Sequence, residues 1–252
     1  MKKDLLFIAF ILFPIALSCC SSQNIPPGTE EKKEAAVSAS PSGFPFKNGE
    51  TVKYAIKSLG VNAGESTLSF RGLEKYKGKD AYVIVFTARA PNFFDEEQIF
   101  ADAETFYPVA VVRDLNIWGK KEKITEEYDQ EKGIITITKQ GGGKTTTQTL
   151  NKPGPIDNIY CFIYRTRRNG KFNVGDSFSI ALPTKDVVIK LVKMTNLKTA
   201  GRNFDAYYMQ SDPAKYKVWF DTSDKKIPLR INGAIGINDT AMTMAEYKET
   251  AD

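Results

Sequence analysis

Apolar and polar residues alternate with a period of two along most of the chain after residue 43. In the segment TVKYAIK, Val52, Tyr54 and Ile56 share one face of a strand, while the two lysines share the other. Similar strand patterns occur at residues 66–70, 81–88, 108–112, 134–138, 178–182, 216–220, 227–231 and 242–244.

Two of these segments, AYVIVFTA (81–88) and PVAVV (108–112), are apolar on both faces. Something should therefore cover both sides of the sheet at these strands. The charged segment 120–128 is separated from 134–138 by the turn-forming residues DQEKG. This spacing predicts that the two segments pair as a hairpin.

Residues 157–170 break the period of two and predict a helix. Asp157 suits an N-cap, and Gly170 follows an asparagine as a stop signal. Ile156 and Tyr160 fall on one helical face, together with residue 163 or 164. We therefore predict an all-β fold, a strongly curved antiparallel sheet or incomplete β-barrel, in which one short α-helix covers an opening.

The first residues have the pattern of an export signal. Two lysines precede the apolar run Leu5–Leu17, which is shorter than the about 20 residues needed to cross a bilayer. The run ends in Ala-Leu-Ser before Cys19, which resembles a bacterial lipobox. By this resemblance Cys19 becomes the mature N-terminus and carries acyl chains. Cys20 is a poorer candidate because a cysteine, not a small residue, precedes it. A plain cleaved signal is the alternative.

The next segment, Ser21–Gly43, has no aromatic residue and is rich in serine, proline, alanine and paired charges. Such a segment does not bury enough apolar surface to order itself, and its random-coil reach is about 24–29 Å. We predict a signal peptide at 1–18, a lipidated N-terminus and disordered tether at 19–43, and one β-barrel-like domain at 44–249. The residue after Cys19 is not aspartate, which favours the outer membrane, facing the periplasm.

Composition excludes several classes of function. The chain has no histidine and only three cysteines, so histidine-ligated metals, Ser-His-Asp catalysis and all-cysteine zinc sites are excluded. The net charge is +5, and loss of residues 1–18, with two lysines and one aspartate, leaves +4. This is too small for a nucleic-acid partner. We predict no metal and no cofactor.

Four segments suggest chemistry but have simpler interpretations. Gly141–Thr145 lacks the first glycine and the following helix of a phosphate loop, so it is better read as a hairpin tip. Asp221–Asp224 offers oxygen ligands for calcium without the later EF-hand residues, so a polar turn is favoured. The acidic run 95–97 reads as a solvated loop. Cys161 has no histidine to activate it, and reads as a small buried apolar residue.

Aromatic and basic residues supply the candidate ligand contacts. Trp118 and Trp219, with the Tyr207–Tyr208 pair, suit a groove for an acyl chain, glycan or peptide, although aromatics on strands are more often core. Arg165, Arg167 and Arg168 suit an anionic lipid or polymer, although such residues more often form a solvated helix end. We take Trp118, Trp219, Arg165 and Arg167 as candidate contacts.

Three segments, at residues 44–70, 157–182 and 217–236, carry a family resemblance. The matching residues of the first are Gly49, Glu50, Tyr54, Gly60, Ala63 and Gly64. Those of the second are Asp157, Tyr164, Arg165, Gly175 and Asp176, and those of the third are Trp219, Asp224, Pro228, Leu229 and Arg230. In order and spacing they resemble the bacterial envelope domain-of-unknown-function family 3108. The resemblance implies a strongly bent antiparallel sheet or incomplete barrel in an exported protein. Since the family has no assigned activity, it supplies no catalytic residue.

These observations lead to three functional hypotheses. The first is a non-catalytic envelope lipoprotein, held to the membrane by its N-terminal lipid, whose β-domain binds an apolar, lipid or glycan ligand or an envelope protein. The second is an assembly factor that contacts envelope proteins through an edge strand or the basic helix end. The third is a carboxylate-only, glycan-active enzyme, which needs two carboxyl groups about 5–9.5 Å apart across a cleft.

Overall fold

The computed structural model describes residues 43–233 and 240–249. Cys19, the predicted signal peptide and nearly all of the predicted tether lie outside these residues. Within them the chain forms fourteen strands and one helix. The elements are β1 Thr51–Ser58, β2 Val61–Tyr76, β3 Lys79–Ala90, β4 Phe93–Asp102, β5 Pro108–Ile117, β6 Lys120–Asp129, β7 Ile134–Gly141, β8 Lys144–Asn151, α1 Ile159–Asn169, β9 Ser177–Leu182, β10 Lys185–Thr199, β11 Arg202–Asp212, β12 Lys217–Asp221, β13 Pro228–Asn232 and β14 Thr240–Lys248.

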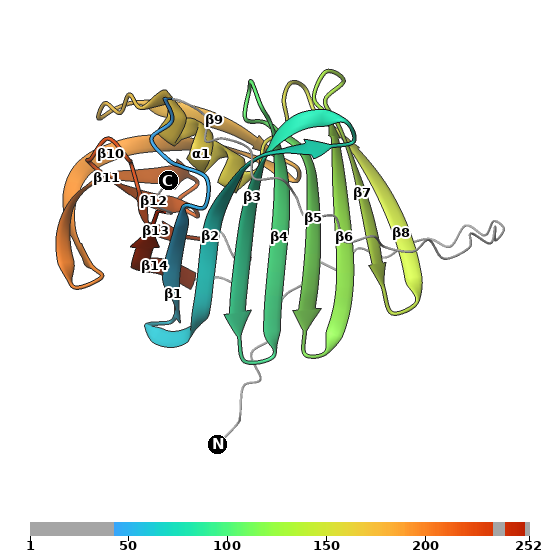
Figure 1. Cartoon of the computed structure of the whole chain (residues 1–252), viewed down its shortest axis with the longest axis horizontal. Helices are drawn as coiled ribbons and strands as arrows, with labels where there is room; N and C mark the ends of the chain where they lie inside the picture. The colour runs from blue at the N-terminus through green and yellow to red at the C-terminus, as the bar shows by residue number, and fades with distance from the viewer. Residues whose placement is uncertain (1–42, 234–239, 250–252) are drawn as a thin grey trace. The chain divides into compact units, whose positions relative to one another are not determined.

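All fourteen strands belong to one antiparallel sheet, in the order β8-β7-β6-β5-β4-β3-β2-β1-β14-β13-β12-β11-β10-β9 (Figure 1). The first and last strands pair in the middle of this sheet. The two edges, β8 and β9, are joined through α1 and do not pair with each other. The sheet is therefore a barrel that does not close, which confirms the predicted fold class. The predicted hairpin of β6 and β7 is also confirmed.

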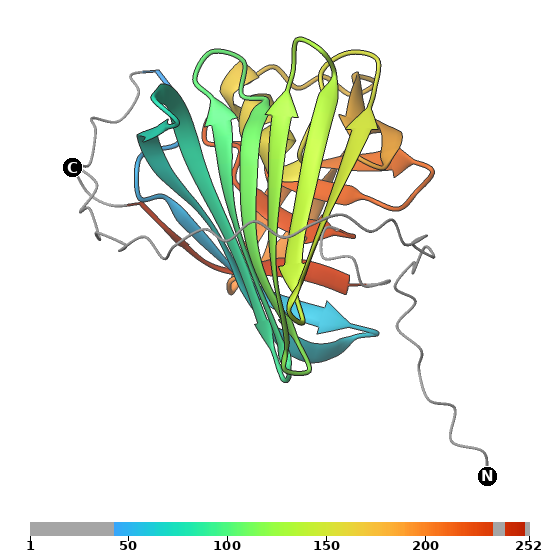
Figure 2. The ribbon, with the colours of Figure 1, turned by 90° about the vertical axis from the view of Figure 1, so that its right-hand side faces the viewer.

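The sheet bends strongly between its two parts, β1–β8 and β9–β14, which meet where β1 pairs with β14. Seen from the side, β10–β14 cross behind the long strands β4–β8 at a steep angle (Figure 2). The apolar core lies inside the bend and combines side chains from both parts of the sheet with those of α1. This core runs from Phe46 to Met244, and residues 37–252 form one compact unit that contains it.

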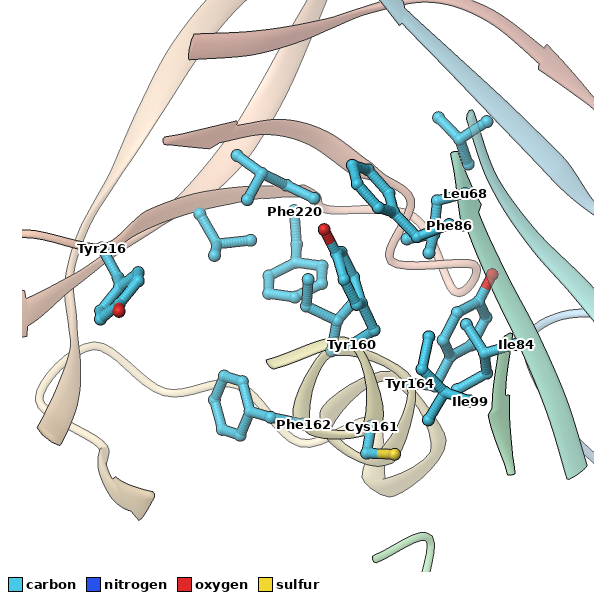
Figure 3. Close-up of a cluster of buried hydrophobic side chains, with 14 of the residues drawn as sticks. Leu68, Ile84, Phe86, Ile99, Tyr160, Cys161, Phe162, Tyr164, Tyr216 and Phe220 are labelled. Atoms are coloured by element: carbon cyan, nitrogen blue, oxygen red, sulfur yellow. The ribbon is translucent and has the colours of Figure 1, made fainter. Parts of the chain in front are cut away.

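Helix α1 is buried on almost every side. The buried residues are Tyr160, Cys161, Phe162, Ile163, Tyr164, Thr166 and Arg167. Figure 3 shows the Tyr160 side chain of the helix between Phe86 of β3 and Phe220 of β12. Tyr160 stacks on Phe86, with ring centroids 4.6 Å apart. A helix enclosed by a curved sheet exposes little surface to solvent, so its first six residues, IYCFIY, are apolar beyond a single stripe.

The helix begins one residue later than predicted. The N-cap is Asn158, whose side chain accepts a hydrogen bond from the Tyr160 N–H at 2.8 Å. Asp157 is not the cap because its carboxylate pairs with Arg165. The predicted end is confirmed, since Gly170 adopts a left-handed conformation with φ 67°.

The doubly apolar strand β3 is buried on both faces, as its sequence predicts. Tyr82, Ile84 and Phe86 face the core around α1. Val83 and Val85 join a second, smaller apolar cluster on the other face. The side chains of that cluster come from β3, β4 and β5, with partly buried neighbours that include Tyr76 on β2.

The segment between β8 and α1 fills part of the gap between the sheet edges. The Asp157 N–H donates to the Ala181 carbonyl of β9 at 2.7 Å. The Gln130 side chain bonds both the N–H and the C=O of Ile156, at 2.8 Å each. These contacts hold the start of α1 against both parts of the sheet.

Candidate functional site

A group of charged side chains lies on the core-facing side of β4, β5 and β6. We define it as the inner cluster: Asp95, Glu97, Arg113 and Glu126. In the antiparallel register Glu97 is opposite Arg113, and Glu126 is opposite Val111, a residue of the core. Because side chains alternate between faces, this register places all four on the inner face.

Arg113 holds two of the carboxyl groups together. Its Nε and Nη2 donate to the two oxygens of Asp95 at 2.7 and 2.6 Å. Its Nε also lies 3.5 Å from Glu97 Oε1. Glu126 accepts a hydrogen bond from the Tyr128 hydroxyl at 2.5 Å. The Asp95 side chain is 1% exposed, Glu97 15% and Arg113 34%, so the cluster reaches solvent on the arginine side.

The inner cluster has three carboxyl groups and one guanidinium. Burial raises the pKa of Glu97 to about 7; nearby Arg113 opposes this rise, and Asp95 and Glu126 add to it. Burial also raises the pKa of Glu126, against the hydrogen bond from Tyr128 and the charge of Arg113. The cluster therefore exchanges protons near neutral pH and lacks one or more positive partners when fully ionised.

We expect the domain to lose stability as the pH rises from about 4.5 to about 7. The folded state raises the pKa of Glu97, so it binds this proton more tightly than the unfolded chain does. This stabilisation, on the order of 1–3 kcal/mol, is complete below the ordinary pKa of glutamate. It is lost as the pH rises through the raised pKa of Glu97.

Urea unfolding at about pH 5 and about pH 8 measures this loss. Glu97→Gln should flatten the pH dependence, because the variant has no carboxyl at this position to titrate. Glu96→Gln is the matched control, since the neighbouring side chain points to the other face of the same strand. An unchanged pH dependence in the Glu97 variant would contradict the prediction.

The structure corrects the interpretation of residues 95–97 as a solvated loop. They lie within strand β4, and Asp95 is buried. In FFDEEQIFAD, Asp95 and Glu97 share a face with Ile99, which is fully buried. Reading that period of two through the acidic run would have placed both carboxyls on the inner face.

The two tryptophans do not form a common groove. Trp118 is 69% exposed at the turn between β5 and β6. Trp219 lies on β12, against the ring of Tyr208 at 4.8 Å and the guanidinium of Arg230 at 5.0 Å. Its strand neighbours Val218 and Phe220 are buried in the core, and Trp219 is partly buried and packs against the same core.

The basic helix end is not a solvated surface, contrary to expectation. Arg167 is fully buried and donates from both terminal nitrogens to Glu50 at 2.6 and 2.8 Å. Arg165 pairs with Asp157 and lies over the Tyr107 ring at 4.2 Å. Arg167 has no surface for a ligand, and most of Arg165 is committed to internal partners.

The simpler interpretations of two other segments are confirmed. Gly142 and Gly143 form the tip between β7 and β8, and a strand follows them in place of the helix of a phosphate loop. Asp221 accepts hydrogen bonds from the Ile227 N–H and the Ser223 hydroxyl, at 2.7 Å each, as expected for a polar turn.

The position of Cys161 disfavours a nucleophilic role. Cys161 is fully buried, and burial raises the pKa of its thiol, which disfavours the nucleophilic thiolate. Among residues 43–233 and 240–249, no group of three or more histidine, cysteine, aspartate or glutamate side chains is arranged to hold a metal ion.

Two hollows lie away from the inner cluster. One, of about 420 Å³, lies where the segment from Pro153 to Asp157 meets β9 and β10. The other, of about 600 Å³, is formed by β1, β2, β3 and β14, near the Lys53–Glu246 ion pair. Neither is lined by an inner-cluster residue or a tryptophan.

One antiparallel sheet that bends around a helix without closing defines the class of incomplete, barrel-like β-domains. The chain belongs to the family described as "Protein of unknown function (DUF3108)", whose family model matches residues 51–245.

Two solved structures are similar to the chain. One is a β-barrel-like protein of domain of unknown function DUF1849 from Brucella abortus, with 9% identity, a TM-score of 0.42, and coverage of 79% of this chain and 97% of that chain. The other is described as a candidate lipoprotein from Parabacteroides distasonis, with 11% identity, a TM-score of 0.29, and coverage of 84% and 100%. No curated protein matches the chain. In the part of the chain that the structure describes, no helix is long and apolar enough to span a membrane.

Proposed function

We propose that this protein is a non-catalytic lipoprotein of the cell envelope whose β-domain binds an envelope-derived ligand or protein segment at the inner cluster. The observation that carries the proposal is that Asp95 and Glu97 share Arg113 on the inner face of an open sheet, while a third carboxyl, Glu126, lies close enough to raise the pKa of Glu97. Buried carboxylates without partners are unfavourable. A bound group that is positively charged or donates hydrogen bonds would offset this cost, so the ligand should carry one.

The arrangement of the carboxyl groups supports a binding role over catalysis. A glycan-cleaving pair needs one protonated acid and one ionised, available carboxylate. Both oxygens of Asp95 accept hydrogen bonds from Arg113. Burial shifts Glu97 and Glu126 toward their protonated forms. The third carboxylate, Asp95, is thus occupied by its arginine.

The N-terminal sequence supports the membrane attachment. The apolar run, the lipobox-like residues before Cys19 and the polar segment that follows are the parts of a lipidated, tethered protein. The absence of aspartate after Cys19 favours the outer membrane, with the β-domain in the periplasm. The tether would let the domain reach ligands within about 24–29 Å of the anchor.

Native mass spectrometry of the whole acylated protein, purified from its own envelope extract, tests the binding proposal. We expect a reproducible mass increase from a bound small molecule or segment. Glu97→Gln should reduce it, because the substitution removes a carboxyl that faces the ligand.

The matched control is again Glu96→Gln, which should retain the bound mass. Wild-type protein without any added mass, or equal retention by both variants, would contradict binding at the inner cluster.

A second candidate function rests on strand β8. This strand is an edge of the sheet, and its residues Lys144–Thr149 are exposed on both faces. An exposed edge can accept a strand from another protein. The same mass measurement separates the two functions, since a co-purifying protein in place of a small ligand would favour the assembly factor.

A further inference from the structure

The hairpin tips at one end of the sheet differ from those at the other. In an antiparallel meander, successive tips alternate between ends. The tips after β1, β3, β5 and β7 therefore lie together, at the lower end in Figure 1, and α1 lies toward the opposite end. The Trp118 N–H donates to the Asn92 carbonyl at 2.8 Å, which joins two of these tips. We call these four tips the lower rim.

The lower rim carries large apolar side chains in full contact with solvent. Leu59 is 73% exposed, Val61 70% and Trp118 69%. These are the three highest exposures among the large hydrophobic residues of the described chain. None of the three adds to the core, so the folded domain alone does not account for them.

Two of these residues also occupy unfavourable backbone positions. Leu59 has φ 50° and is followed by Gly60 with φ 82°, while Trp118 has φ 54° and is followed by a glycine with φ 78°. Two successive positive φ angles in a two-residue loop define a type I′ turn, which favours asparagine, aspartate or glycine at its first position. Leucine and tryptophan are conformationally costly there, so their large side chains require another explanation.

The charge of the lower rim is positive. Residues 57–63, 89–94, 116–121 and 140–145 contain Lys57, Arg89, Lys120, Lys121 and Lys144 and no acidic residue. The opposite tips, residues 75–80, 101–108 and 128–134, contain four basic and five acidic residues. One of them, Lys77-Gly78, has the same backbone as the Trp118 turn but carries a charged residue at its first position.

We propose that the lower rim docks on the surface of an anionic lipid bilayer. Tryptophan and leucine at projecting tips enter the interface, and the surrounding lysines face the lipid headgroups. The Leu59 and Trp118 turns are four strand spacings apart, about 19 Å, which gives two separated points of contact. The inference rests on the proposed lipoprotein function for its membrane. It adds a defined orientation, with the helix end directed away from the bilayer.

Vesicle flotation tests the docking with residues 37–252, the compact unit, which contains no acylation site. We expect binding to vesicles of phosphatidylglycerol mixed with phosphatidylcholine, weakening as salt is added. The double variant Leu59→Asn with Trp118→Asn should reduce vesicle binding by about tenfold. It should unfold at the same or a higher temperature, because asparagine is favoured at both turn positions.

Lys77→Asn is the matched control, since it changes the same type of turn at the opposite end. It should bind the vesicles as the wild type does. Absence of wild-type binding, or equal binding by the double variant, would overturn the proposal. Since this unit carries no acyl chain, the outcome does not depend on acylation or on the inner cluster, and a failure here leaves the proposed function separately testable.

Discussion

Replacing Arg167 with methionine should lower the free energy of unfolding by about 3–5 kcal/mol, the largest effect on stability that we expect. The guanidinium is fully buried and donates from both terminal nitrogens to Glu50. Its Nε also donates to the Lys225 carbonyl at 3.1 Å, and Tyr247 donates to Glu50 at 3.0 Å. Without the arginine, Glu50 would be a buried carboxylate with its main partner missing.

Urea unfolding of the purified domain measures this effect. Arg168→Met is the matched control, because Arg168 is half-buried and has no carboxylate partner among the described residues. It donates a hydrogen bond to the Glu104 carbonyl and makes cation–π contacts with Phe44 and Phe106. The double variant Glu50→Leu with Arg167→Met should recover part of the loss, since it leaves no unpaired charge. Equal losses from the two arginine variants would show that the buried pair has no special role.

Replacing Cys19 with alanine should abolish incorporation of a fatty-acid probe, the second large effect. The proposed acyl chains are attached at this residue, and each buried methylene contributes about 0.8 kcal/mol to membrane binding. A single chain holds a protein only reversibly, so stable attachment requires the two or more chains that a lipoprotein receives. Metabolic labelling followed by purification measures incorporation directly.

Cys20→Ala provides the control in the neighbouring position and should keep the label. Incorporation that survives Cys19→Ala but not Cys20→Ala would move the attachment site by one residue. Exported wild-type protein without label would refute the lipoprotein proposal, whatever the β-domain binds.

The strands could be predicted because side-chain alternation is local. Val52, Tyr54 and Ile56 are all buried on β1, as their period of two requires. The burial of Arg167 could not be predicted, because its partner Glu50 is 117 residues away. In sequence, Arg165, Arg167 and Arg168 look equivalent at a helix end. Their different environments depend on where the curved sheet brings β1 against α1.

The inner cluster was missed for a related reason. A run of three acidic residues suggests solvent exposure, whereas the alternation of the surrounding strand places Asp95 and Glu97 inside. Which face of β4 lies inside depends on the direction in which the whole sheet bends. The exposed position of Trp118 depends on a two-residue turn, and a large apolar residue is an unusual choice there.

The pairing of β1 with β14 affects the order in which the domain can assemble. Thr51 and Lys248 are partners in this ladder, so almost the whole β-domain lies between these two paired strands in the sequence. Until β14 is available to pair, β1–β8 and β9–β13 are two half-sheets, and their inner edges, β1 and β13, have no backbone partner. Such late, long-range closure favours slow folding and exposes those edges to aggregation. The nascent domain should therefore depend on chaperones until its last strand is available.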